Sequence, residues 1–328
     1  MEKNWLSDFN LYERNCYECI KFTIPEILCD TGLGHVMEVI EFVRVKFHRY
    51  IKKDVYLKYL EVPITTRCNL RCKDCSNLIQ YYENPYHIDA KQLFRDIYRV
   101  SQSVRQIKQL RILGGEALLH PKLFCILKKL GQIENIREIQ LVTNGTVLPD
   151  ERLIRLLKAG KYSVDLSNYQ EKSIHRKEWI RLMKENNIRY ITQKGRIEWT
   201  AQADFSYRNR NEEQLEKALS SCKMDCINML NGRLNLCPRS SHGMDLGIVP
   251  DDNKNYVDFR NVSSKKAARK QLYNLLNIKY IMACNYCDIF LGNKLKKVRA
   301  AEQISKTEAM RIFNETLDLK KEEMLDYE

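Results

Sequence analysis

The sequence has no long apolar run, no signal-peptide pattern, no internal repeat and no low-complexity tract. A bilayer-spanning helix needs about 20 consecutive apolar residues, and a secreted chain carries an apolar leader. These absences predict a cytoplasmic protein without a membrane partner. Stacked aromatic residues that hold single-stranded RNA are also absent. Nucleic acid is therefore not the expected partner, although 55 Lys and Arg against 42 Asp and Glu give a net charge of +13, spread along the chain.

Cysteine, in contrast, is abundant, with 12 residues in a chain of 328. Disulfides are rare in a reducing cytosol, so this number favours metal ligation. The length is sufficient for a barrel and a smaller domain, each with its own core.

Three cysteines, Cys68, Cys72 and Cys75, form a C-x3-C-x2-C segment. A cubane iron–sulfur cluster normally takes four thiolates, so three thiolates from one loop leave one iron open to a chelating molecule. A zinc knuckle or plain structural thiols are the alternatives. A zinc site, however, needs four ligands and usually takes them from C-x2-C pairs.

Further polar and glycine residues follow the predicted strands that come after this loop. Gly114, Gly115 and Glu116 follow a strand at 109–113, and Asn144 and Ser167 follow strands at 138–143 and 162–166. Glycines let the main chain approach a ligand, and a carboxylate suits an ammonium group. Barrels of parallel strands carry their active groups at these carboxyl ends.

Strands and helices alternate through this part of the chain. Predicted strands at 59–65, 109–113, 138–143, 162–166 and 188–192 are separated by predicted helices at 89–104, 122–130, 150–159 and 173–185. Such spacing implies βαβ units and a parallel sheet. The expected fold class is α/β, a partial (β/α)6 TIM-like barrel followed by a small C-terminal domain that contains a hairpin.

With its motifs in this order, the chain resembles the radical S-adenosylmethionine (SAM) enzymes. The resemblance implies that Cys68, Cys72 and Cys75 hold a [4Fe–4S] cluster whose open iron binds the amino and carboxylate groups of SAM. It implies reductive cleavage of SAM to a 5'-deoxyadenosyl radical, with electrons from a flavodoxin- or ferredoxin-type donor. The implied SAM contacts are Gly114, Gly115, Glu116, Asn144 and Ser167.

One position departs from the family pattern. Many members have an aromatic residue directly before the third cysteine, against the adenine, where this chain has Asp74. Tyr81 and Tyr82 follow closely and are candidates for that contact, or they are packing residues.

A second group of cysteines lies in the C-terminal part. Asn231 and Gly232 separate two short alternating segments and predict a type I′ hairpin. Counting outward from this turn places Cys226 opposite Cys237, with Cβ atoms about 5 Å apart. Much later, Cys284 and Cys287 form a C-x2-C pair.

The spacing of this group resembles the twitch half of the SPASM extension, which implies an auxiliary [4Fe–4S] cluster. Family spacing favours Cys222 as the first ligand, and hairpin geometry favours Cys226; a structural zinc site is the alternative for the whole group. We expect Cys226 to be a spare thiol, either a small buried packing residue or a catalytic hydrogen-atom donor. The expected ligands are Cys222, Cys237, Cys284 and Cys287.

The expected domains are an N-terminal helical extension at 1–57, the barrel at 58–210, the twitch domain at 211–298 and a charged C-terminal helix or tail at 299–328. An amphipathic helix is predicted at 36–50, with Val39 and Val43 on its apolar face. Cys16 and Cys19 form a C-x2-C pair and are expected to be structural, because two ligands cannot complete a cluster. Cys29 stands alone, and Cys125 is expected in the core.

The resemblance leaves the substrate open. The first expectation is an oxidoreductase or epimerase that acts on a small polar molecule such as a sugar or aminocyclitol. Oxidation is expected ahead of epimerisation, because a spare thiol is more often structural. A peptide-modifying enzyme is the alternative. A non-catalytic iron–sulfur regulator or electron carrier has no need of a SAM pocket.

Overall fold

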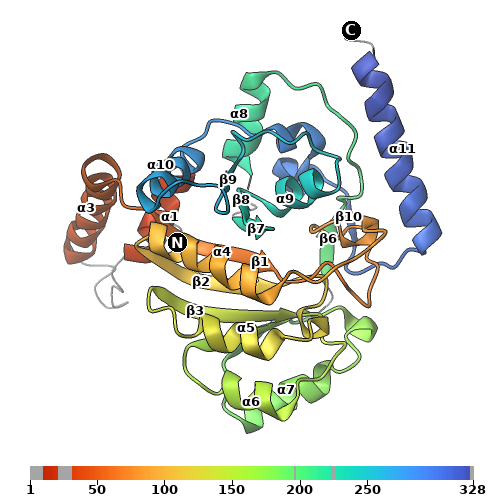
Figure 1. The fold of residues 1–328 in the computed structure, drawn as a ribbon, viewed down its shortest axis with the longest axis horizontal. Coiled ribbons are helices and arrows are strands. Elements are labelled where there is room, and N and C mark those ends of the chain that lie inside the picture. The colour runs from red at the N-terminus through yellow and green to blue at the C-terminus, as the bar shows by residue number, and fades with distance from the viewer. Residues whose placement is uncertain (1–9, 21–31, 196, 223–225, 326–328) are drawn as a thin grey trace.

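In the computed structural model, residues 10–20, 32–195, 197–222 and 226–325 are described. Their central element is an eight-stranded sheet with the order β5-β4-β3-β2-β1-β7-β8-β9 (Figure 1). Five of its strands are consecutive and parallel: β1 (Tyr56–Pro63), β2 (Gln106–Leu113), β3 (Ile136–Thr143), β4 (Tyr162–Leu166) and β5 (Tyr190–Thr192).

A helix follows each of the strands β1 to β4 and leads to the next strand. These helices are α4 (Ala90–Ser103), α5 (Leu123–Leu130), α6 (Glu151–Leu157) and α7 (Arg176–Glu185). Local chemistry sets where they begin: the Asp89 carboxylate accepts from the Gln92 N–H at 2.8 Å, and Asp150 accepts from the Leu153 N–H at 2.8 Å. Both are N-cap contacts that satisfy otherwise unpaired donors of the first turn.

The predicted α/β class with a largely parallel sheet is confirmed, but the sixth strand of the expected (β/α)6 barrel differs. Strand β6 (Glu198–Thr200) leaves the sheet and pairs antiparallel with β10 (Lys297–Arg299). The edge of β1 that faces away from β2 is instead occupied by β7 (Asn228–Leu230), which runs parallel to it.

The hairpin is formed by β7 and β8 (Arg233–Asn235), with Leu230 paired to Arg233 as the turn signal predicts. Asn231 and Gly232 both have positive φ, 53° and 83°, as a type I′ turn requires. Because Asn228 pairs with Glu61 of β1, the hairpin and β9 (Tyr256–Asp258) continue the sheet of the barrel.

The remaining C-terminal elements surround this end of the sheet (Figure 1). They are α8 (Glu212–Ser221), α9 (Pro238–Asp245), α10 (Lys265–Leu276) and the 3-10 segments η6 (Met282–Tyr286) and η7 (Ile289–Lys294).

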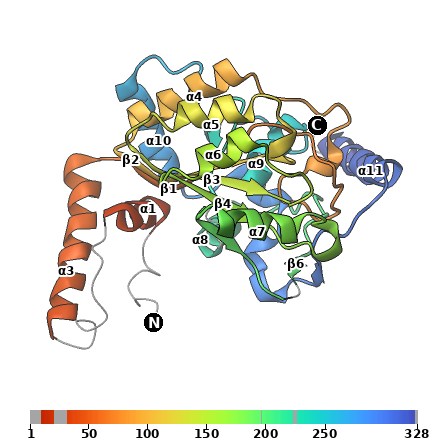
Figure 2. The ribbon, with the colours of Figure 1, turned by 90° about the horizontal axis from the view of Figure 1, so that it is seen from below.

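At the N-terminal end, α1 (Leu11–Ile20) packs against β1, and α3 (Gly32–Phe47) extends away from the sheet beside α1 (Figure 2). A π-helical turn, η2 (His48–Lys52), follows α3. The predicted helix is present, but its apolar face is not buried, since Val39 is 61% and Val43 58% exposed. Cys125 on α5 is also exposed, so the expectation that it lies in the core was wrong.

The charged C-terminal segment forms α11 (Lys306–Leu325), which docks on η3 (Ile79–Tyr81). Ala309 is fully buried there, and Phe313 stacks on Tyr81 with ring centroids 5.8 Å apart. Cys29 lies outside the described residues. None of the helices in the described ranges combines the length and apolar character needed to cross a membrane.

Candidate active site

The cysteine loop follows β1 and lines a cavity of about 500 Å³ at the carboxyl ends of the parallel strands. Pockets of a few hundred Å³ are the size that holds a small molecule or cofactor. The cavity brings together most of the residues expected at the SAM site: Cys68, Cys72, Cys75, Gly114, Gly115, Asn144 and Ser167.

The glycine pair holds the cysteine loop against the end of β2. The Gly115 N–H donates to the Thr65 carbonyl at 2.8 Å, and the Glu116 N–H donates to the Arg67 carbonyl at 2.8 Å. A Cβ on Gly115 would lie 2.3 Å from the Arg67 carbonyl oxygen. Glycine is therefore required here for the approach of two backbone segments, in addition to any approach of a ligand.

Polar hydrogens point at the thiols of the loop. The Asn144 Nδ2 group donates to Cys68 Sγ at 3.7 Å, and Gln303 Nε2 donates to Cys72 Sγ at 3.2 Å. Burial raises the pKa of the Cys68 and Cys72 thiols to about 12. Of the three thiols on this loop, Cys72 is buried and Cys68 and Cys75 are partly buried. With their N–H donors they fit a cluster, which binds them as thiolates and takes up their charge.

Glu116 does not line the cavity and is 1% exposed. Its carboxylate accepts from the Leu118 N–H at 3.1 Å, the Thr143 hydroxyl at 2.9 Å and the Asn144 N–H at 2.8 Å. Burial raises its pKa, and these donors oppose that shift. Protein donors contact both carboxylate oxygens, and the bond from the Asn144 N–H fixes the backbone at that residue. The expected contact of Glu116 with the SAM ammonium stays a prediction.

The aromatic lining of the cavity comes from Tyr169 and Trp199, whose rings meet edge to face with centroids 5.4 Å apart. Tyr81 and Tyr82 do not line it. Tyr81 packs on Phe313, and the Tyr82 hydroxyl donates to Asp245 at 2.8 Å. The alternative that these two tyrosines are packing residues agrees with their placement.

Asp74, the departure from the family pattern, connects the cysteine loop to the segment after β6. It is 5% exposed, and its carboxylate accepts from the backbone N–H groups of Gln202 and Ala203, the latter at 2.9 Å. This contact closes one side of the cavity, which Asp74 and Gln202 both line.

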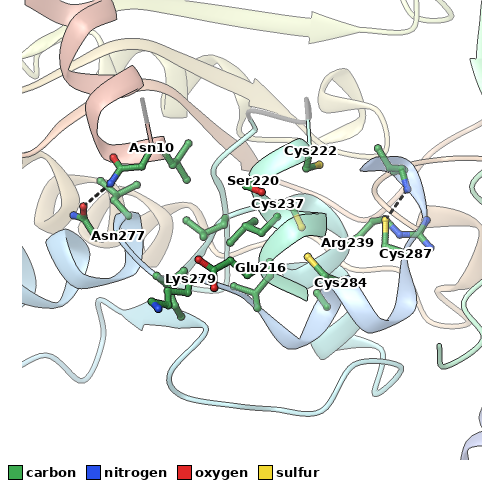
Figure 3. Close-up of a pocket in the computed structure, with 18 of the residues that line it drawn as sticks. Asn10, Glu216, Ser220, Cys222, Cys237, Arg239, Asn277, Lys279, Cys284 and Cys287 are labelled. Atoms are coloured by element: carbon green, nitrogen blue, oxygen red, sulfur yellow. Dashed lines mark hydrogen bonds between the residues drawn. The ribbon is translucent and has the colours of Figure 1, made fainter. Parts of the chain in front are cut away.

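A second cavity of about 400 Å³ lies beside the first. Figure 3 shows four sulfur atoms gathered at one end of it, with Asn10, Asn277 and Lys279 at the other. The four belong to the residues expected to ligate an auxiliary cluster: Cys222, Cys237, Cys284 and Cys287. The same four residues come from α8, α9 and the segment around η6.

Cys226 is placed apart from this set. It lines the first cavity, together with Cys68, Cys72 and Cys75, and does not line the second. Of the two ligand sets considered from the sequence, the one with Cys222 therefore agrees with the arrangement of the sulfur atoms. Pro238 lines both cavities and forms part of the wall between them.

Backbone and cationic groups surround the second set of cysteines. Cys237 is the N-cap of α9, and its sulfur accepts from the Ser240 N–H at 3.4 Å, at the positive end of the helix dipole. The Arg210 guanidinium donates to the carbonyls of Cys284 and Cys287, the latter at 2.8 Å. Burial raises the pKa of the Cys284 thiol to about 12, while Arg210 opposes the shift.

No group of three or more His, Cys, Asp or Glu in the described ranges lies within reach of one metal ion. A cubane cluster differs from a single ion because each thiolate binds a separate iron.

The comparisons with known proteins agree with this geometry for one part of the chain. Residues 62–196 match the model of the radical SAM superfamily. This part of the chain, which contains the cysteine loop, the glycine pair and Asn144, is a radical SAM domain.

Among curated proteins, the chain is 33% identical over 113 residues to a GTP 3',8-cyclase of Geobacter sulfurreducens, which is 34% of this chain and 34% of the cyclase. It is 31% identical over 151 residues to a GTP 3',8-cyclase of Clostridium perfringens, covering 44% of this chain and 42% of that protein. The chain thus spans less than half the length of these relatives. Among solved structures, native anSMEcpe with bound AdoMet matches 80% of this chain and 98% of that chain at 17% identity and a TM-score of 0.44.

Proposed function

We propose that the protein is a radical SAM enzyme that epimerises a small polar substrate, with Cys226 as the hydrogen-atom donor. The observation that carries this proposal is the position of Cys226 in the cavity of Cys68, Cys72 and Cys75. The sequence alone favoured oxidation over epimerisation because a spare thiol is more often structural. A thiol that lines the first cavity, where the reaction is proposed to occur, favours epimerisation over oxidation. This cavity is called the reaction cavity below.

In this proposal, Cys68, Cys72 and Cys75 hold one [4Fe–4S] cluster, with SAM between Asn144 and Ser167. When bound, SAM at such a cluster supplies a carbon radical that removes a hydrogen atom from the substrate. The protein groups then decide the outcome: Asn144 and the backbone of Gly115 orient SAM, Tyr169 and Trp199 cover the adenine side, and Cys226 faces the substrate from the β7 side.

In the same proposal, an auxiliary [4Fe–4S] cluster of the kind found in twitch domains occupies the second cavity. Its ligands are Cys222, Cys237, Cys284 and Cys287. The shared wall at Pro238 keeps the two cavities adjacent. Electrons reach the enzyme from a flavodoxin- or ferredoxin-type donor. The N–H groups that donate to the sulfurs of Cys68, Cys72 and Cys237 support this assignment, because hydrogen bonds to the ligand sulfurs tune cluster potentials.

The cavity lining favours a substrate rich in hydroxyl or amino groups. Glu61, Glu198, Gln202 and Lys297 line the same cavity as the cysteines. Carboxylates and an ammonium group bind hydroxyl and amino groups by charge-assisted hydrogen bonds, and the amide of Gln202 adds neutral ones. A sugar or aminocyclitol-like molecule is therefore the first substrate class to test.

A cyclisation of GTP is the second candidate, because the curated relatives are GTP 3',8-cyclases. A precursor peptide is the third, as the alternative drawn from the sequence. Both enter the same experiment as test substrates.

The experiment is an anaerobic incubation of cluster-loaded protein with SAM, reduced flavodoxin and each substrate class in deuterated water. The classes are nucleotide sugars, free aminocyclitols, GTP and a peptide. Epimerisation predicts a product of unchanged composition with one solvent deuterium at the reacting carbon, and no such product from Cys226→Ser. A product two hydrogens lighter, formed equally by both proteins, would establish oxidation and leave Cys226 without a catalytic role.

A further inference from the structure

Glu61 is a buried acid in the reaction cavity that the expected SAM and cluster contacts leave unexplained. It lies on β1 between Leu60 and Val62, which are fully buried on the opposite face of the strand, and it is itself 6% exposed. Successive side chains of a strand point to opposite faces, so Glu61 faces the cavity that it lines together with Cys226. Burying an ionised carboxylate costs free energy unless an opposite charge or hydrogen-bond donors compensate it.

Arg111 of β2 provides the pairing. Its guanidinium donates to Glu61 at 2.8 Å, to Asp165 of β4 at 2.7 Å and to Gln140 of β3 at 3.0 Å. These residues form a polar row across four neighbouring strands. The row fixes the position of the Glu61 carboxylate and balances its charge.

Cys226 is held against this carboxylate by both backbone and side chain. The Glu61 N–H donates to the Ile227 carbonyl at 2.8 Å, which ties β1 to the residue next to Cys226. A hydrogen bond from the Cys226 side chain lowers the pKa of Glu61, as Arg111 does, whereas burial raises it. Thiol, carboxylate and guanidinium thus form a continuous chain of contacts.

We propose that Glu61 is the positioning residue of Cys226 and the group through which a proton reaches its sulfur after each turnover. The proposal rests on the hydrogen-donor role of Cys226. The carboxylate accepts the thiol hydrogen bond and so fixes the sulfur at the cavity wall.

When Cys226 gives a hydrogen atom to the substrate radical, its S–H bond breaks, a C–H bond forms and a thiyl radical remains. A reduced [4Fe–4S] cluster held by Cys222, Cys237, Cys284 and Cys287 would supply the one electron that converts the thiyl to a thiolate, and one proton restores the thiol. The negative charge on sulfur raises the proton affinity of the neighbouring carboxylate, so a proton taken from solvent by Glu61 passes to the sulfur.

The test compares Glu61→Gln with wild type by the reactivity of Cys226 in cluster-loaded protein without SAM or substrate. The rate of alkylation by iodoacetamide is measured against pH, residue by residue, by peptide mass spectrometry. Removing a carboxylate beside a thiol favours the thiolate, so the pH midpoint for Cys226 should fall by roughly one unit. The exposed Cys125 serves as the internal reference thiol.

Glu198→Gln is the matched control, because Glu198 lines the same cavity from β6. In the Glu198→Gln variant, the pH midpoint of Cys226 alkylation should equal that of wild type. A purely structural effect of Glu61→Gln would speed alkylation at every pH without moving the midpoint. Glu61→Asp keeps the charge at a greater distance and should give a smaller shift, which also provides a readout if the Gln variant does not fold.

An unchanged midpoint in both Glu61 variants would overturn the inference, while solvent deuterium delivered by Cys226 would still support the epimerase. The reverse result, a shifted midpoint but no deuterium that depends on Cys226, would overturn the epimerase and with it the proton role of Glu61. The two failures are therefore distinguishable.

Discussion

The two cysteine-lined cavities are built in different ways. The first takes Cys68, Cys72 and Cys75 from one loop after β1, so their spacing is set by local chain geometry. The second draws its sulfurs from the end of α8, the N-cap of α9 and the segment around η6. A local motif can be identified from its spacing alone, whereas a site assembled from distant segments depends on how these segments pack.

The largest expected effect comes from removing the cysteine ligands of one cavity at a time. Two [4Fe–4S] clusters hold about eight irons per chain. Replacing Cys68, Cys72 and Cys75 with Ala should remove about half of the iron and abolish SAM cleavage. Replacing Cys284 and Cys287 with Ala should remove the other half and leave reductive SAM cleavage measurable. Iron analysis and assay of 5'-deoxyadenosine check both; zinc in the second cavity of anaerobically purified protein would contradict the auxiliary cluster.

A Gly115→Ala substitution should damage the first cavity and spare the second. The new Cβ would meet the Arg67 carbonyl oxygen at 2.3 Å and the Cys68 Cβ at 2.7 Å, so the cysteine loop must shift. Overpacking of this kind costs about 1–3 kcal/mol. Thermal unfolding and iron content should report lower stability and loss of about half of the iron.

Gly160→Ala is the control for this change, because a Cβ there meets nothing within 4 Å. It should keep the iron content and the melting temperature of wild type. Equal iron in the Gly115 and Gly160 variants would show that the close approach is not needed for the cluster.

Acid should lower the stability of the folded protein through His242 of α9, whose Nδ1 lies 2.8 Å from the Tyr82 hydroxyl. Burial lowers its pKa from 6.5 to about 4, and Asp245 opposes the shift. Since the folded pKa is depressed, the unfolded chain takes up the proton first as pH falls from 6.5 to 4. Stability present above pH 6.5 is lost over that window, by roughly 3 kcal/mol at most.

The measurement is the melting temperature of wild type and His242→Asn at pH 7 and pH 4.5, followed by circular dichroism. The variant should lose less stability than wild type between the two values. Equal losses would mean that His242 is protonated in the folded protein as easily as in the unfolded chain.

The smallest effect is expected from Gln303, which donates to Cys72 Sγ at 3.2 Å and accepts from the Arg71 N–H at 2.6 Å. Gln303→Leu should keep the iron content but lower the reduction potential of the first cluster, because a hydrogen bond to a ligand sulfur stabilises the reduced state. Redox titration followed by electron paramagnetic resonance checks this. Glu302→Gln, next to it in the chain, should leave the potential unchanged.

Several elements of the fold were predictable because their signals are local. Asp89 and Asp150 cap the helices that they were expected to begin, and Asn231 and Gly232 form the predicted turn. The prediction failed where burial depends on distant partners. The apolar face at Val39 and Val43 is exposed, although its spacing is that of a buried helix face.

The residues of the candidate site also divide into those with a local sequence signal and those placed by distant segments. Glu61 is the one acid in the predicted strand at 59–65, and that acid was a signal that could have pointed to it. Tyr169, Trp199 and Gln303 had no comparable signal, because each reaches the cavity or a sulfur from a segment that is remote in sequence.

The sequence by itself determined the three-cysteine loop, the glycine pair after the second barrel strand and the alternation of strands and helices. These depend on spacing within a few residues and on backbone freedom at glycine. Only the tertiary structure placed Cys222 and Cys226 in different cavities, because the cavity that each residue lines depends on how distant segments pack. It also turned the Glu116 carboxylate inward, since three protein donors converge on it only after β2 and β3 have paired.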